Sequence, residues 1–100
     1  MTETKVIDTE KYINFVRQTT SPASSDFNQL VARMTELELE NDVDTPRLLT
    51  AAFGISAEAG EFTEVVKKVF LQGKPYSQET EFHLKRELGD IFWYLAQACM

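Results

Sequence analysis

The chain has 100 residues, 43% hydrophobic and 26% charged, which is typical of a single globular domain spanning residues 1–100. Its formal net charge of -6 argues against nucleic acid or an anionic membrane as the main partner, because both are themselves negatively charged. There is no signal-peptide pattern and no apolar run of about 18 residues, and the single Cys99 excludes an internal disulfide, so we expect a cytoplasmic protein.

Apolar residues at spacings of three and four predict about four helices and no strand. The first helix is expected over about 8–18, with Asp8 or Thr9 as its N-cap. The segment 19–25 contains serines and a proline and is predicted to be a turn. A second helix is expected to begin at 24–26 and to end in the acidic stretch at 38–44.

The third helix is expected over about 46–70, because Thr45 followed by Pro46 is typical of an N-cap and a first helical residue. Gly73 marks its end. Ser77 is placed to cap a fourth helix, which runs to the end of these residues. We therefore predict an all-α fold, a helical bundle whose third and fourth helices carry the functional site.

The apolar residues of these two helices predict close packing and association. Gly54 and Gly60 each cost about 1 kcal/mol relative to alanine inside a helix, and the simplest reason to tolerate Gly60 is the close approach of another helix. The fourth helix keeps an apolar side as far as Cys99. We expect another subunit or further chain to cover that side, and we predict a homo-oligomer.

Two acidic pairs lie within the same helices: Glu58 with Glu61, and Glu87 with Asp90. Positions three apart share one helix face, so an antiparallel pair of helices can bring four carboxylates together. Four bare carboxylates would repel one another, and a hard divalent cation is the best explanation for such a cluster. The competing interpretation is a solvated acidic face. The pairs interrupt apolar stripes, which favours the metal site without deciding between the two.

The segment AAFGISAEAGEFTEVVKKVFLQGKPYSQETEFHLKRELGDIFWYLAQA resembles the signature region of the MazG-like nucleotide pyrophosphohydrolases, members of the all-α NTP pyrophosphatase superfamily. The family signature is E-x-x-E, a helix–loop–helix and E-x-x-D. Here it reads Glu58-Ala-Gly-Glu61, 25 residues, then Glu87-Leu-Gly-Asp90. The resemblance covers about residues 45–100.

The resemblance implies hydrolysis of the α–β phosphate link of a nucleoside triphosphate, (d)NTP, to the monophosphate and pyrophosphate. This is a house-cleaning reaction on nucleotide pools. It implies Glu58, Glu61, Glu87 and Asp90 as ligands of Mg²⁺, with Mn²⁺ as an alternative ion. One glutamate, Glu61 being the first candidate, would accept a proton from the attacking water, and the choice among the glutamates stays open. The resemblance also implies dimers or tetramers with pockets lined by two subunits.

Three further residues are candidates for substrate binding. Lys68 lies seven residues after Glu61 and can share its face, and Lys74 follows in the loop. Both are candidates for binding phosphate, and the alternative for Lys68 is an ion pair with a glutamate one turn earlier. Tyr94, four residues after Asp90, resembles a position that touches the nucleotide in related dCTP-cleaving enzymes. Its alternative role is as an amphipathic core residue.

Two other functional classes are compatible with the residues. The chain can be a non-catalytic regulator that binds nucleotide or a partner, or a plain helical oligomerisation module with solvated acids. Members of the resembled family continue with another helix after the position of Met100, where further nucleotide contacts arise. The preferred (d)NTP stays open.

Overall fold

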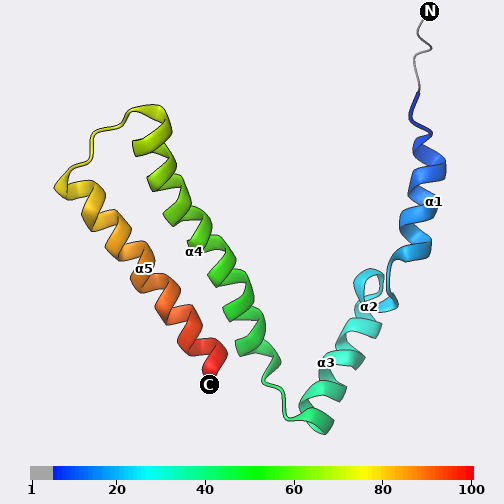
Figure 1. Ribbon diagram of the computed structural model, residues 1–100. Coiled ribbons are helices and arrows are strands. Elements are labelled where there is room, and N and C mark those ends of the chain that lie inside the picture. Colours follow the sequence, from blue (N-terminus) through cyan, green and yellow to red (C-terminus); the bar gives the residue numbers. More distant parts are fainter. Residues whose placement is uncertain (1–5) are drawn as a thin grey trace, which may run out of the picture. The chain divides into compact units, whose positions relative to one another are not determined.

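The computed structural model describes residues 6–100. All regular structure in this part of the chain is helical (Figure 1): α1 (Thr9–Thr19), α2 (Pro22–Ser25), α3 (Phe27–Asn41), α4 (Thr45–Gln72) and α5 (Gln78–Cys99). The prediction of an all-α class is confirmed. The described helices form two compact units that divide between Asn41 and Asp42. Among the described helices, none combines the length and apolarity needed to cross a membrane.

The first unit contains α1, α2 and α3. The Asp8 carboxylate accepts a hydrogen bond from Lys11 N at 3.0 Å, so of the two predicted caps, Asp8 and Thr9, it is Asp8 that caps α1. The Asp26 carboxylate does the same for Gln29 N at 3.1 Å at the start of α3. The short helix α2 was predicted to be a turn, and this prediction is wrong for Pro22–Ser25. Proline at the first helical position is compatible with a single helical turn.

The second unit begins with α4, which starts one residue before the predicted position. The Asp44 carboxylate accepts a hydrogen bond from Arg47 N at 3.2 Å, so Asp44 is the N-cap. The prediction of Thr45 as the cap is therefore wrong, because the neighbouring aspartate takes that role. Asp44 also forms a 3.3 Å ion pair with Arg47 Nε. At the same end of the hairpin, Arg47 Nη1 donates to Gln97 Oε1 on α5 at 3.0 Å.

The turn between α4 and α5 follows the predicted signals. Gly73 is the C-cap of α4 in the left-handed conformation, with φ 71°. This reversal lets Lys74 N donate to the carbonyl oxygen of Lys68 at 3.0 Å. Ser77 and Thr80 then form a reciprocal capping box at the start of α5.

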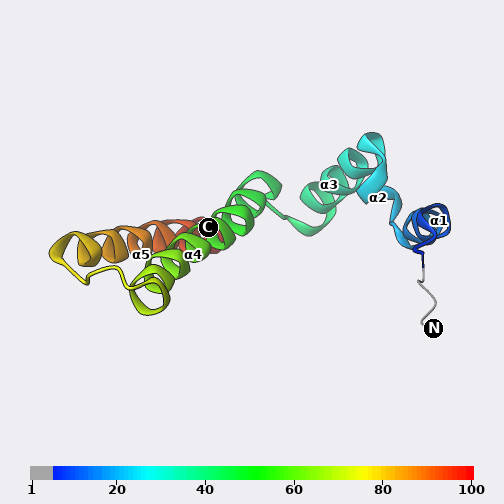
Figure 2. The ribbon, with the colours of Figure 1, turned by 90° about the horizontal axis from the view of Figure 1, so that it is seen from above.

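Helices α4 and α5 pack side by side as an antiparallel hairpin, as both views show (Figures 1 and 2). The side chains between them are buried or half-buried and recur every three or four residues, the spacing of helices that pack along a seam. We call this set the seam; it consists of Ala51, Gly54, Ile55, Glu58, Phe62, Val65 and Val69 on α4, and Thr80, Leu84, Glu87, Ile91 and Tyr94 on α5. Two of its positions are therefore carboxylates in an otherwise mainly apolar contact.

Gly54 marks the closest approach of the two helices. A Cβ atom built on Gly54 would overlap the ring of Tyr94, so only glycine leaves room for that ring. At Gly60, by contrast, no described atom other than its chain neighbours and the adjoining backbone of its own helix lies within 4 Å of such a Cβ. The prediction that Gly60 accommodates another helix is therefore wrong within this hairpin, and Gly54 has that role.

Replacement of Gly54 by alanine is expected to lower the free energy of unfolding by about 1–3 kcal/mol, because the new methyl group overpacks the seam at Tyr94. Gly60→Ala is the matched control. Its Cβ meets open space, so helix propensity alone should raise the free energy of unfolding by up to about 1 kcal/mol. Urea denaturation followed by circular dichroism measures both changes. Equal stabilisation by the two substitutions would contradict the close contact.

The hairpin leaves most of its large apolar side chains in solvent. Among the described residues, Ala51 is the one hydrophobic residue that is fully buried. The exposed apolar residues of this unit are Leu48, Leu49, Phe53, Phe70, Leu71, Tyr76, Phe82, Leu88, Phe92, Trp93, Leu95 and Met100. Such extensive apolar exposure is unusual for a monomer and is consistent with association with partner chains.

Candidate metal centre

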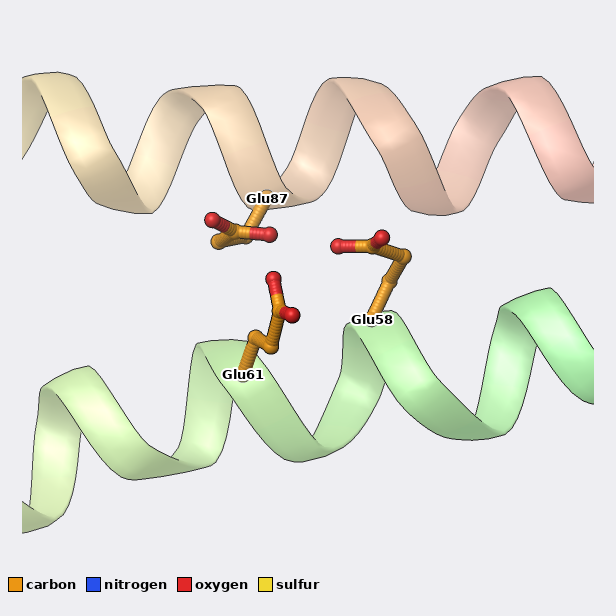
Figure 3. Close-up of side chains that lie close together, drawn as sticks. All are labelled: Glu58, Glu61 and Glu87. Carbon is orange, nitrogen blue, oxygen red and sulfur yellow. The ribbon is translucent and has the colours of Figure 1, made fainter.

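Three carboxylates meet near the middle of the seam (Figure 3). Glu58 and Glu61 lie about one turn apart on α4 and face Glu87 on α5. One oxygen of each residue belongs to a group whose members all lie within 4.8 Å of one another. The antiparallel pairing predicted from the two acidic motifs is therefore present for three of the four acids.

The three acids differ in how far they are withdrawn from solvent. Glu87 is only 4% exposed, Glu58 is half-buried and Glu61 is exposed. The Oε2 atoms of Glu58 and Glu87 are buried and, when both acids are ionised, have no hydrogen-bond donor among the described residues. Arg86 Nη2 lies 3.5 Å from Glu87 Oε1, a long contact from a half-exposed side chain. Buried carboxylate oxygens without donors are costly, so these two atoms fit a bound cation.

The closeness of the acids changes their protonation. A hydrogen bond with Glu87 is the largest cause that raises the pKa of Glu58 to about 7, followed by loss of solvation and by repulsion from Glu61. The same hydrogen bond lowers the pKa of Glu87 below its ordinary value. Without a metal, the Glu58–Glu87 pair therefore holds one proton below about pH 7. A divalent cation would take the place of that proton.

The donor set suits a hard cation. All three groups are carboxylates, the ligand type that Mg²⁺ and Mn²⁺ share. Opposite ligands of an octahedral Mg²⁺ lie about 4.2 Å apart, close to the 4.8 Å limit of the group. Small rotations of the flexible glutamate side chains would close that difference. The residues present therefore fit the ion that the acidic motifs predict.

The other predicted site residues lie near these acids or further along the hairpin. Asp90 is half-buried on α5, one turn after Glu87, and its carboxylate does not belong to the group within 4.8 Å. Tyr94 packs on Gly54 in the seam, with its ring against that of Trp93 at 5.0 Å. Their roles as metal ligand and nucleotide contact stay predictions.

Lys68 and Lys74 line a cleft at the closed end of the hairpin. Lys68 Nζ lies 3.9 Å from Glu64 Oε1, so the predicted alternative of an ion pair one turn earlier is also present. Phosphate binding by the two lysines stays a prediction.

Two residues that shape the site were not singled out as site residues from the sequence. Arg86 is the nearest described cation to the buried acid Glu87, but consecutive residues on a helix point in different directions, which hid this contact. Gly54 lies four residues before Glu58 on the same helix side. The spacing of the apolar residues could have placed Gly54 in the seam and marked it as the point of close approach.

The pH dependence of stability follows from the Glu58 carboxyl group. Its pKa of about 7 exceeds the ordinary 4.5, so the folded protein binds more protons than the unfolded chain between these values. The free energy of unfolding of the metal-free protein should therefore fall as pH rises from 4.5 to about 7. The lowered pKa of Glu87 acts in the opposite direction, below the ordinary value of a glutamate.

Mg²⁺ competes with the shared proton, so its effect on the melting temperature should grow with pH. In EDTA, the contribution of the Glu58–Glu87 pair should lower the melting temperature from about pH 5.5 to about pH 8. Added Mg²⁺ should raise it more at the higher pH. Scanning calorimetry with Glu58→Gln as control isolates this contribution. An equal Mg²⁺ effect at both pH values would contradict proton–metal competition at Glu58.

The described residues define an α-helical hairpin with a candidate divalent-metal centre on its seam. No family model, no curated protein and no solved structure matches this chain. The likeness of residues 51–98 to the MazG-like enzymes therefore stays a prediction that rests on the motifs themselves.

Proposed function

We propose that the protein is a Mg²⁺-dependent nucleoside triphosphate pyrophosphohydrolase that converts a (d)NTP to its monophosphate and pyrophosphate. The observation that carries the proposal is the meeting of Glu58, Glu61 and Glu87 across two helices, with buried and donorless oxygens. The spacing of these acids within E-x-x-E and E-x-x-D motifs supports the same chemistry. The corresponding house-cleaning role is the removal of surplus or non-standard nucleoside triphosphates from the nucleotide pool.

The different solvent exposures of the three acids support different roles for them in the proposed reaction. Glu87 and Glu58 are held by the seam and would fix the position of the ion. A bound Mg²⁺ would offset the substrate's charge, polarise the attacked phosphoryl group and lower the pKa of a bound water. Glu61 is the most exposed of the three and lies at the solvent side, where it can accept a proton from the attacking water. No covalent nucleophile is required.

Oligomerisation fits the same proposal. The exposed apolar residues of α4 and α5 give the hairpin a large surface for a second chain, and a substrate pocket can then be lined by two subunits. The alternative function, a non-catalytic nucleotide-binding or regulatory oligomer, needs the same surface. Hydrolysis of the nucleotide is the property that distinguishes the enzyme from the non-catalytic oligomer.

Incubation with a panel of nucleoside and deoxynucleoside triphosphates in Mg²⁺ tests the proposal. We expect equal amounts of monophosphate and pyrophosphate, no reaction in EDTA, and partial activity with Mn²⁺. Nucleotide binding without turnover would overturn the enzyme and favour the regulator. Release of inorganic phosphate instead of pyrophosphate would show that a different phosphoanhydride bond is cleaved.

A further inference from the structure

A cleft lies at the closed end of the hairpin, between the last turns of α4, the loop after Gly73 and the first turns of α5. We call it the hairpin cleft. Its polar lining includes Lys68, Lys74, Ser77, Thr80 and His83, and Val65 and Val69 form an apolar wall. The cleft is thus rich in hydrogen-bond donors, within a chain whose net charge is -6.

The turn geometry brings the two lysines to one place. Gly73 adopts φ 71°, which reverses the chain immediately after α4. Lys74 N then donates to the carbonyl oxygen of Lys68, so the two backbones are tied together at 3.0 Å. Both side chains consequently border the same cleft although they are six positions apart in the sequence. A residue with a side chain at Gly73 would strain this reversal.

The charges around the hairpin cleft leave the lysines available to an anion. Glu64 pairs more closely with Lys67, at 3.0 Å, than with Lys68, at 3.9 Å. Lys74 forms no ion pair within the described part of the chain. The one carboxylate that lines the cleft is Glu79, and its Oε1 lies 3.5 Å from His83 Nε2.

The hairpin cleft adjoins the acidic centre along both helices. Val65, at its near edge on α4, comes four residues after Glu61. His83, at its near edge on α5, comes four residues before Glu87. Four residues correspond to about 6 Å along a helix axis. An elongated polyanion that reaches the acids through a metal can therefore extend into the cleft.

We propose that the hairpin cleft binds the pyrophosphate end of the substrate, with Lys68 and Lys74 as its charge partners. The identity of this ligand rests on the proposed function, whereas the anion site itself rests on the cleft. The cleft would thus bind the pyrophosphate leaving group. The three acids, through a bound metal ion, would position the phosphoryl group that water attacks.

Titration with sodium pyrophosphate in EDTA tests the anion site alone, because the acids then have no metal through which to bind the probe. Nitrogen-15 NMR should show saturable shifts of the amides of Lys74 and residues 76–80. Lys68→Gln and Lys74→Gln should each weaken the pyrophosphate affinity about tenfold, the loss of one charge-assisted contact. Lys67→Gln is the matched control, since Lys67 does not line the cleft, and it should bind like the original protein.

The same proteins are assayed for pyrophosphate release from a (d)NTP in Mg²⁺. Turnover without saturable pyrophosphate shifts in the cleft overturns the cleft proposal and leaves the proposed function intact. Pyrophosphate binding that depends on Lys68 and Lys74, without turnover, supports the anion site and overturns the proposed function. Equal affinities for all three lysine variants overturn the cleft proposal, because the lysines then contribute nothing specific.

Discussion

Substitution of Glu87 by glutamine is expected to abolish Mg²⁺-dependent pyrophosphate release and to stabilise the metal-free protein. Glu87 is the most buried of the three acids, so its loss removes the ligand that the seam holds most firmly. Loss of a partner outside the ligand shell already costs about 10–100-fold in metal affinity, and loss of a direct ligand should cost more than about 100-fold. Without metal, the glutamine amide can donate to Glu58 and relieves the crowding of carboxylates.

Glu64→Gln is the matched control for this substitution. Glu64 lies one turn after Glu61 on α4, but its carboxylate pairs with Lys67 at 3.0 Å and is not part of the cluster. Glu64→Gln should keep full turnover and lose only the surface ion pairs with Lys67 and Lys68, which contribute little to stability. Pyrophosphate release and thermal melting in EDTA are measured on both variants. If Glu87→Gln retains turnover, the carboxylate cluster is not required for the reaction.

Joint substitution of Phe53 and Phe92 by serine is expected to break the predicted oligomer. The two side chains are 71% and 67% exposed on α4 and α5, although each is large and apolar. Burial of one phenylalanine contributes about 1.5–3 kcal/mol, so the loss of two should raise the dissociation constant by more than about 100-fold. Sedimentation equilibrium measures the oligomer, and circular dichroism reports whether the subunits remain helical.

Lys85→Ser controls for the removal of a long side chain from the same helix. The Lys85 side chain is 73% exposed and pairs with Glu81 one turn earlier. The substitution Lys85→Ser should leave the dissociation constant of the oligomer unchanged. If the original protein sediments as a folded monomer of 11.4 kDa, the predicted association is wrong. The exposed apolar residues would then need another explanation.

Local signals along the chain were sufficient to predict the long helices. Asp8, Gly73 and Ser77 act at helix ends as predicted, because a cap depends only on residues a few positions away. The start of α4 was misplaced by one residue because Asp44 and Thr45 are both good caps. Local sequence does not decide which of two adjacent caps the helix uses.

The contacts between α4 and α5 were harder to predict, because they depend on the register of two helices rather than on either helix alone. Both acidic pairs were identified from their spacing, and three of the four carboxylates meet. The register brings Glu87 across from Glu61 and close to Glu58 (Figure 3), whereas Asp90 comes one turn later on α5 and is not in the group. The same register places Tyr94 on Gly54 and leaves Gly60 in open space. Spacing on one helix indicates which residues lie in the seam, but it does not indicate which residue of the other helix each of them contacts.

Crystals soaked in Mn²⁺ provide the most direct test of the metal centre, because Mn²⁺ scatters anomalously and accepts the same oxygen ligands as Mg²⁺. We predict an anomalous peak within about 2.2 Å of carboxylate oxygens from Glu58, Glu61 and Glu87, and its absence in crystals of Glu87→Gln. The same peak shows whether Asp90 joins the ligands. A well-ordered hairpin with no peak among these three acids would contradict the account.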